Sequence, residues 1–138
     1  MSNGVAEVQV FSVLPVTSTA VNNTSPMFAY AGDDWVESAN RGIGDFGDDV
    51  QASNTVGSTA TFTWTGTAAA IYSETYSDQG LYSITLDGAA RPDVDTSSAN
   101  RGVQVPIFSV SGLGAGTHTV VITHSSGSWM TIDSATWA

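Results

Sequence analysis

The sequence predicts an all-β domain: a jelly-roll β-sandwich of two antiparallel sheets, with about eight to nine strands and no significant helix. Two observations support this prediction. Apolar residues alternate with threonine along Thr59–Thr65 and with polar residues along Leu81–Leu86. A period of two turns one set of side chains toward a core and the other toward solvent. Short segments of this kind recur between glycine-rich or polar turns, and no stretch shows the period of a helix.

The chain is 138 residues long and contains no cysteine. This length is typical of one domain with its own hydrophobic core. The absence of cysteine excludes disulfides, thiolate metal sites and a cysteine nucleophile. We expect one β-sandwich domain over residues 1–138, in which residues 1–19 contribute an extra N-terminal strand with a linker and residues 20–138 form the jelly-roll module.

Acidic residues dominate the charge of the chain. It carries 13 acidic residues against three basic ones, all arginine, for a formal net charge of −10. Such a surface repels phosphate groups and anionic lipid, which argues against nucleic acid and membrane surfaces as partners. No apolar run is long enough for membrane insertion. Neutral partners, such as a sugar or another protein, fit this charge, and the alternative is that the acidity serves solubility alone.

The N-terminal part mixes strand and loop signals. Val5–Val16 has the pattern of one strand with a bulge, Thr17–Ser25 that of a polar linker, and Pro26–Tyr30 that of a short strand. Residues Asp33–Asn54 show no helical period and are rich in glycine and aspartate. They are expected to form a long covering or functional loop, with room for a short strand around Phe46.

The C-terminal part contains the clearest strand patterns. After Thr59–Thr65 we expect strands at Ala68–Tyr72, Leu81–Leu86, Val103–Val110, Thr117–Thr123, Trp129–Asp133 and Ala135–Trp137. Ser73–Gly80 is expected to be a polar hairpin loop, and Ala89–Gly102 a long polar loop. Asp87-Gly88 is a strong hairpin-turn signal. Pro106 cannot donate a backbone hydrogen bond, which predicts an edge strand or a bulge at that position.

Several phrases of the sequence carry a family resemblance. They are NNTSPMFAYAGDDW at Asn22–Trp35, GSTATFTWTGTAAAIY at Gly57–Tyr72, GLYSITLDG at Gly80–Gly88 and VPIFSVSGLGAGTHTVVITHSSGSWMTID at Val105–Asp133. Together they resemble the galactose-binding-domain-like jelly rolls, which occur as carbohydrate-binding modules and lectin-like domains of bacterial and fungal proteins. The resemblance implies a sandwich fold and a sugar-binding role, although fold alone does not set function.

Aromatic residues are the first candidates for a sugar site, because the apolar C–H face of a pyranose stacks on a flat ring. Trp64 and Trp137 fall in strand patterns and are expected in the core. Trp129 follows a tight turn and is the best candidate for an exposed stacking platform. Tyr76 lies in a polar loop and Trp35 follows a Gly-Asp-Asp turn, so both are further candidates, with packing as the alternative role.

Polar candidates follow from the chemistry of vicinal hydroxyls, which arginine and aspartate meet with paired hydrogen bonds. Arg41 and Arg101 lie in long loops, each within the repeated pentapeptide Ser-Ala-Asn-Arg-Gly, and Asp34 precedes a candidate tryptophan. The repeat is either a coincidence or the mark of two similar loop clamps. The alternative, slightly favoured by the many acidic residues, is that each arginine pairs with a surface aspartate.

Calcium is the one cofactor that the sequence leaves open. Asp45, Asp48 and Asp49 offer hard oxygen ligands close together in the chain, but their spacing does not match an EF-hand loop. A solvated acidic loop is the favoured alternative.

Catalytic motifs are absent from the sequence. It contains no Gly-x-Ser-x-Gly elbow and no His-Glu-x-x-His zinc motif. His118 shares a face with Val120 and Ile122, which predicts a core histidine, and His124 ends the same strand. We therefore expect a protein that is not an enzyme.

Two functions follow. The first is a non-catalytic, lectin-like domain that binds neutral glycans through Asp34, Trp35, Arg41, Tyr76, Arg101 and Trp129. It would act outside the cell or at the cell surface, with a leaderless cytoplasmic lectin as the alternative. The second is a structural subunit of a surface layer or filament, a homo-oligomer in which the strand Val5–Val16 pairs with the sheet edge of a neighbour.

Overall fold

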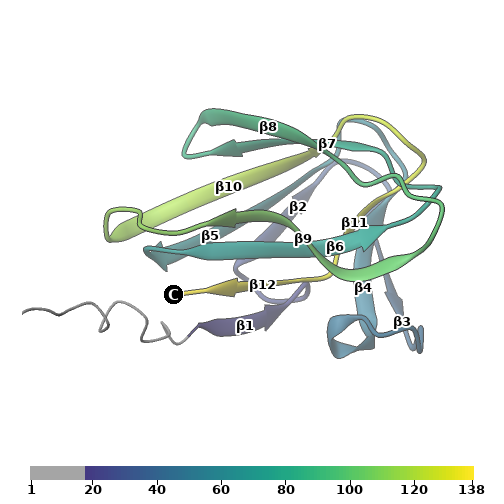
Figure 1. Ribbon diagram of the computed structural model, residues 1–138, viewed down its shortest axis with the longest axis horizontal. Helices are drawn as coiled ribbons and strands as arrows, with labels where there is room; N and C mark the ends of the chain where they lie inside the picture. Colours follow the sequence, from purple (N-terminus) through teal and green to yellow (C-terminus); the bar gives the residue numbers. More distant parts are fainter. Residues whose placement is uncertain (1–17) are drawn as a thin grey trace, which may run out of the picture.

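The computed structural model describes residues 18–138, and Figure 1 shows them as an all-β sandwich. A five-stranded sheet in the order β2-β5-β10-β7-β8 faces a four-stranded sheet in the order β1-β12-β6-β9, and a third sheet, β11-β4-β3, stands at one end. Among these residues the helical content is limited to a 3-10 turn at Phe46–Asp48. No helix there has the length and apolar character needed to cross a bilayer.

Every strand pair in the three sheets is antiparallel. The five-stranded sheet consists of β2 (Phe28–Ala31), β5 (Thr59–Gly66), β10 (Gly116–His124), β7 (Leu81–Leu86) and β8 (Ala89–Asp95). The four-stranded sheet consists of β1 (Thr19–Asn22), β12 (Ser134–Trp137), β6 (Ala69–Thr75) and β9 (Gly102–Val110). The small sheet consists of β11 (Met130–Ile132), β4 (Asp49–Ser53) and β3 (Val36–Ala39). The all-β prediction is therefore confirmed, with twelve strands in the described part instead of about eight or nine.

The core follows the period-two alternation of the sequence. On β5, Phe62 and Trp64 are 1% and 2% exposed, whereas Thr63 and Thr65 between and after them face solvent. On β7, Ile84 is 3% exposed. Strand backbones turn successive side chains to opposite faces, so this alternation buries one face of each strand between the two larger sheets. The core assignment of Trp64 is confirmed, and Trp137 packs half-buried at the edge of the same cluster.

The turn at Asp87-Gly88 joins β7 to β8 as predicted. Asp87 and Gly88 have φ angles of 50° and 84°, and positive φ at both central residues is the mark of the two-residue hairpin turn that fits the twist of the strands. Leu86 pairs with Ala89 directly across this turn. The prediction that Ala89–Gly102 is a loop is wrong over Ala89–Asp95, because this hairpin continues as β8.

Three further expectations need correction. The long loop predicted at Asp33–Asn54 contains β3 and β4, which pair as a hairpin. The linker predicted at Thr17–Ser25 contains β1, which pairs with β12. Ser73–Gly80 joins strands of two different sheets and so is no hairpin loop. In the first two cases polar composition concealed a strand, because strands with an exposed face or an edge position need few apolar residues. The predicted strand Val5–Val16, with its role in subunit contacts, lies outside the described residues.

Pro106 lies on β9, at the edge of the four-stranded sheet. The register of β6 with β9 shifts between Ile71 and Tyr72, whose partners are Phe108 and Pro106. Ile107 is therefore the extra residue of a bulge. The edge position and the irregularity predicted from Pro106 are both confirmed. Proline has no backbone N–H, so it fits poorly in a strand that is hydrogen-bonded on both sides.

The two histidines occupy different environments. His118 lies beside Trp64, with 5.5 Å between ring centroids, but it is only partly buried. Its Nδ1 is 2.7 Å from Asp87 Oδ2, and this bond, the largest cause, raises the pKa of His118. The fully buried histidine is His124, whose Nε2 lies 2.9 Å from the Gly127 carbonyl oxygen. The core histidine expected at His118 is thus at His124 instead.

Asp133 is a buried carboxyl group between β11 and β12. It accepts the backbone N–H of Phe46 at 3.1 Å, which fastens the connection between β3 and β4 to the sandwich. Burial is the main reason that the pKa of Asp133 rises to about 7, and the nearby Asp45, Glu74 and Asp49 add to the rise while the bond from Phe46 opposes it. The folded protein therefore keeps a proton here at pH values where the unfolded chain has lost it.

Truncation of the central core residue should cost much more stability than truncation of its exposed neighbour. Phe62→Ala removes a ring buried between both sheets and leaves a cavity, so the free energy of unfolding should fall by about 3–5 kcal/mol. Thr63→Ala, one residue along on the solvent side, should change it by less than about 0.5 kcal/mol. Urea unfolding followed by tryptophan fluorescence measures both. Equal effects would show that this face of β5 is not the core.

Replacing Asp133 by asparagine should change how stability depends on pH. Because the pKa of Asp133 is raised from 3.8 to about 7, its contribution is fully present below about pH 4 and is lost as the pH rises toward 7. Asparagine has no proton to lose, so Asp133→Asn should flatten this decline, by an amount on the order of a few kcal/mol. Urea unfolding at about pH 4 and about pH 7.5 measures the slope.

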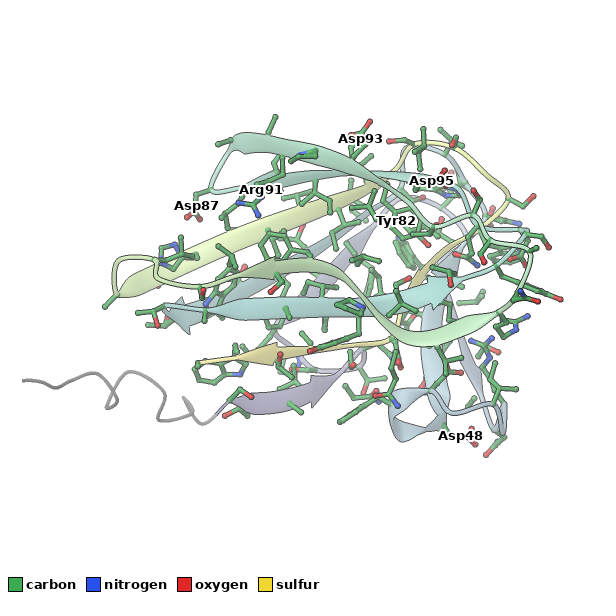
Figure 2. The ribbon with its side chains drawn as sticks, viewed as in Figure 1. Asp48, Tyr82, Asp87, Arg91, Asp93 and Asp95 are labelled. Atoms are coloured by element: carbon green, nitrogen blue, oxygen red, sulfur yellow. The ribbon has the colours of Figure 1, made fainter. Side chains whose placement is uncertain are left out.

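The exposed carboxyl group of Asp93 provides the control for that experiment. Asp93 lies on β8, at the edge of the five-stranded sheet (Figure 2), whereas Asp133 lies between β11 and β12 of the other two sheets. Asp93→Asn should therefore leave the pH dependence as in the wild type. A slope in Asp133→Asn equal to that of the wild-type protein would contradict the assignment of the proton to Asp133.

Candidate functional site

A pocket of about 240 Å³ opens on one face of the small sheet β11-β4-β3. Its floor consists of five short side chains that share this face: Val36 and Ser38 of β3, Val50 and Ala52 of β4, and Thr131 of β11. The register explains their grouping, since Val36 pairs with Ala52, Ala52 with Thr131, and Ser38 with Val50. Antiparallel pairing places partners on the same face, so the sheet presents a low floor without large side chains.

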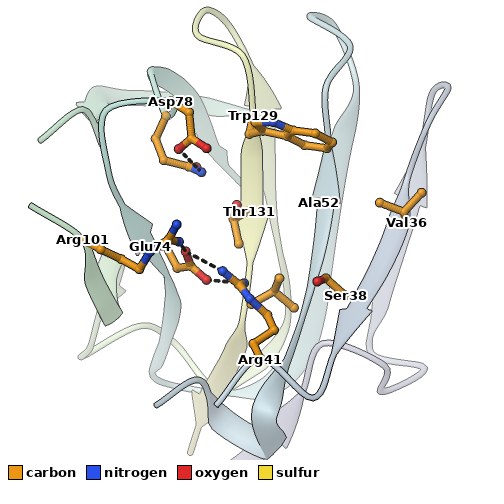
Figure 3. Close-up of a pocket in the computed structure, with 11 residues that line it drawn as sticks. Val36, Ser38, Arg41, Ala52, Glu74, Asp78, Arg101, Trp129 and Thr131 are labelled. Carbon is orange, nitrogen blue, oxygen red and sulfur yellow. Dashed lines mark hydrogen bonds and ion pairs between the residues drawn. The ribbon is translucent and has the colours of Figure 1, made fainter. Parts of the chain in front are cut away.

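Trp129 and Arg41 face each other across this floor. In Figure 3 the Trp129 ring lies along one side of the pocket and the Arg41 side chain along the opposite side. Trp129 immediately precedes β11, and its backbone N–H donates to the Asp78 carbonyl at 3.0 Å. Asp78 and Gln79, from the connection between β6 and β7, complete this wall. This backbone hydrogen bond fixes Trp129 at the rim of the pocket, where its indole is half-buried.

Glu74 is the centre of the polar wall. Its side chain is 1% exposed and pairs with two arginines: Arg41 Nη2 donates to Oε1 at 3.1 Å while Nη1 contacts Oε2, and Arg101 Nη1 donates to Oε1 at 2.5 Å (Figure 3). The register of β6 with β9 shifts at this point, between Ser73 and Thr75. A bulge changes the direction in which the side chains of a strand point. Because of it, the adjacent residues Ser73 and Glu74 are both buried.

Arg101 and Arg41 each have a second partner. The Arg101 guanidinium lies over the Tyr76 ring at 4.2 Å from its centroid, a distance typical of a cation–π contact. Arg41 Nη1 lies 3.3 Å from Asp45 Oδ2, and the Asp45 carboxyl is fully buried. Burial is the main cause that raises the pKa of Asp45 to about 6, with Glu74 adding to the rise and the two arginines opposing it.

The structure brings the two Ser-Ala-Asn-Arg-Gly segments to one point, while their role as ligand clamps stays a prediction. Ser38–Gly42 ends β3 and enters the next loop, whereas Ser98–Gly102 leads into β9. Their arginines meet at Glu74, from opposite sides of the carboxylate in Figure 3. The alternative expectation, a surface aspartate for each arginine, is right that each arginine has an acidic partner. It is wrong about the partners, because both arginines pair with the buried Glu74 of β6 and the aspartate beside Arg41, Asp45, is buried.

The other sequence candidates lie around the pocket or away from it. The Tyr76 ring stacks on the Arg101 guanidinium and does not line the pocket. Trp35 packs on Tyr30, with 4.7 Å between ring centroids, and its indole N–H donates to the Ala31 carbonyl at 3.0 Å. Asp34 is exposed and accepts the Thr55 hydroxyl at 3.0 Å. Of the six ligand candidates, the pocket contains Arg41, Arg101 and Trp129.

The three aspartates considered for calcium do not converge. Asp45 turns inward to Arg41. Asp48, at the lower end of the small sheet in Figure 2, accepts the Gly42 backbone N–H at 2.6 Å, and Asp49 accepts the Asn23 amide at 2.8 Å. Within residues 18–138 no three acidic or histidine side chains are grouped so that they could hold a metal ion. The residues present therefore do not fit calcium at this place.

Sequence reasoning missed Glu74, Asp78, Gln79 and the floor of the pocket. The floor residues are small or hydroxylic and carry no signal of their own. Gln79 is fixed by two bonds: its Oε1 accepts the Tyr82 hydroxyl at 2.6 Å and its Nε2 donates to Asp78 Oδ1 at 3.2 Å. Glu74 carried no signal either, because alternation turns the residue after an inward-facing one toward solvent, and only the register shift with β9 buries Glu74 beside Ser73.

Comparison with known proteins finds similarity in structure. No protein-family model matches the chain, and neither does any curated protein. The CBM36-1 domain of a multidomain xylanase from the hindgut metagenome of Trinervitermes trinervoides matches with a TM-score of 0.56 and 18% identity, over 87% of this chain and 95% of that one. A family two carbohydrate esterase from Cellvibrio japonicus matches with a TM-score of 0.63 and 14% identity, over 87% of this chain and 33% of that one.

A third similar structure is an exo-beta-1,3-galactanase from Phanerochaete chrysosporium, with a TM-score of 0.63 and 14% identity over 88% of this chain and 29% of that one. The present chain thus spans a minor part of the two enzymes and nearly all of the CBM36-1 domain. Identities this low establish the fold alone. The predicted resemblance is confirmed at that level: the chain has the jelly-roll fold found in carbohydrate-binding modules and in parts of carbohydrate-active enzymes.

Proposed function

We propose that this protein is a non-catalytic, lectin-like domain that binds neutral glycans in the pocket on β11-β4-β3. The observation that carries the proposal is the position of Trp129 opposite the arginines. One pocket combines a flat aromatic wall, a floor of small side chains and a wall of fixed hydrogen-bonding groups. This combination suits a pyranose, which is apolar on its C–H faces and polar around its rim.

Stacking on Trp129 supplies the apolar part of the interaction. The indole is half-buried and held at the rim by the bond of its backbone N–H to Asp78. The small side chains of Ala52 and Ser38 leave space in front of the ring. A rigid ring loses little conformational freedom on binding, so its contact area contributes efficiently to affinity.

The polar wall supplies the hydroxyl contacts. Arginine carries five N–H donors in a fixed plane, and the bonds to Glu74 engage Nη1 and Nη2 of Arg41 but Nη1 alone of Arg101. Asp78 and Gln79 add acceptors and a donor at the opposite edge. These groups are held in place before a ligand arrives, which lowers the entropy cost of binding.

The charges of the pocket favour an uncharged ligand and binding without catalysis. Both arginines are already paired with carboxylates, and the chain has a net charge of −10. Glycoside hydrolysis needs two carboxyl groups flanking the scissile bond, one of them able to give up a proton. Glu74 has its oxygens turned to two guanidinium groups, which leaves Asp78 as the other carboxyl group of the pocket.

The structural neighbours add support from their own descriptions. The CBM36-1 domain, matched over nearly its whole length, is part of a xylanase, and a cycloisomaltooligosaccharide glucanotransferase from Paenibacillus contains a similar domain over 18% of its chain. A glycan-binding domain of this kind would act outside the cell or at the cell surface, where polysaccharides are met.

Trp129→Ala should strongly weaken glycan binding while the fold is retained. Loss of the stacking wall should weaken binding by at least about thirtyfold, as is typical of a central aromatic anchor. An array of neutral oligosaccharides identifies the ligand, and isothermal titration then compares the variants. Trp35→Ala removes an indole of similar burial that packs outside the pocket, so it should leave affinity unchanged. A wild-type protein that binds no neutral glycan would overturn the proposed function.

A further inference from the structure

We propose that Glu74 determines the charge selectivity of this pocket, as a buried countercharge that makes it prefer uncharged sugars over sugars that carry a carboxylate. The inference rests on the proposed function and extends it to the substrate class. Glu74 acts through the arginines and is thus a specificity-determining residue that need not touch the glycan. The geometry of the three side chains, one carboxylate between two guanidinium groups, is what points to this role.

The guanidinium groups of the two arginines contact a carboxylate that is more deeply buried than they are. Glu74 is 1% exposed, whereas the side chains of Arg41 and Arg101 are 17% and 34% exposed. The carboxylate therefore lies behind the guanidinium groups, on the protein side of the wall. An opposite charge at hydrogen-bond distance in a buried position interacts far more strongly than one in solvent. The pocket consequently presents N–H donors whose positive charge is already paired.

A carboxylate on a sugar would find no unpaired cation in this wall. Arg101 has Glu74 as its carboxylate partner, and Arg41 has both Glu74 and Asp45. Asp78 adds a further negative charge on the Trp129 side. To bind a uronate, the protein would have to release Glu74 from a buried ion pair, which leaves a buried charge without its partner. A hydroxyl group needs only a spare N–H and meets no such cost.

Stability alone does not account for this arrangement. A buried ion pair often contributes no more to stability than well-packed apolar residues of similar volume, and β6 continues the core pattern up to Ile71 and Ser73. The chain instead brings two arginines from loops about sixty positions apart in the sequence to one carboxylate. Tyr76 holds the more exposed arginine in place. Such a construction keeps arginine donors at a sugar site while cancelling their charge.

The test uses Glu74→Gln, which keeps the size of the side chain and removes its charge. In this variant Arg101 loses its carboxylate partner while Arg41 retains Asp45. The probes are the neutral oligosaccharide bound best on the array and its counterpart of the same linkage and length oxidised to the uronate at C6. Isothermal titration gives the affinity ratio of the two probes. We expect the wild type to prefer the neutral probe at least tenfold, and Glu74→Gln to shift the ratio at least tenfold toward the uronate.

Three further variants separate charge selectivity from folding. Glu74→Gln combined with Arg101→Gln removes the freed cation and should restore the wild-type ratio. Glu74→Asp keeps the charge and should keep the neutral preference. Glu37→Gln removes a carboxylate from β3 that alternation turns away from the pocket, between Val36 and Ser38, and should leave the ratio unchanged. Thermal unfolding checks each variant.

The outcomes distinguish this inference from the proposed function. A folded Glu74→Gln with the wild-type ratio, or one that loses the neutral probe without gaining the uronate, overturns the inference and leaves glycan binding intact. Should Glu74→Gln not fold, the salt dependence of wild-type binding decides. Lowering the salt concentration should not raise the affinity of the uronate probe above that of the neutral probe, since a wall of paired charges offers the carboxylate no free cation. A preference for the uronate at low salt overturns the inference. Failure of the wild type to bind any neutral probe would instead overturn the proposed function.

Discussion

The ion pairs of Glu74 with Arg41 and Arg101 are the interaction on which the candidate site depends. They join β6 to the segments that follow β3 and precede β9. The ladder of β6 with β9 ends at Thr75 and Gly102, next to Glu74 and Arg101, whereas β3 lies in another sheet and its following segment reaches β6 without a backbone ladder. A buried carboxylate is costly unless it is paired, so the loops that carry the arginines must close over it. This requirement shapes one wall of the pocket. The small sheet β11-β4-β3 forms its floor.

The sandwich and the end that carries the site are stabilised by different kinds of interaction. The two larger sheets are held by alternating apolar residues such as Phe62 and Ile84, whose burial is non-directional and tolerant of detail. The end of the sandwich near β3 and β4 is held by polar groups, among them Asp45 and Asp133, which lie buried close together. Their raised pKa values arise mainly from burial. The polar end therefore responds to pH, while the apolar core does not.

Part of the candidate site could be predicted from the sequence. Trp129 after a tight turn and the repeated Ser-Ala-Asn-Arg-Gly around Arg41 and Arg101 identified three pocket residues. Trp35 and Asp34 were selected by the same reasoning but lie outside the pocket. Loop composition shows that a side chain can be near the surface, yet it does not show which loops meet at the same end of a sandwich. Whether each role in glycan binding holds stays a prediction.

The sequence by itself determined the all-β class, the inward faces of β5 and β7 and the turn at Asp87-Gly88, because strand alternation and turn conformation are local properties of neighbouring residues. Only the tertiary structure decided that a third sheet exists, that β1 pairs with β12, and that two distant arginines share Glu74. Those features depend on contacts between segments far apart in the chain. Edge strands with few apolar residues, and polar groups whose partners are remote, leave no periodic pattern from which such contacts can be deduced.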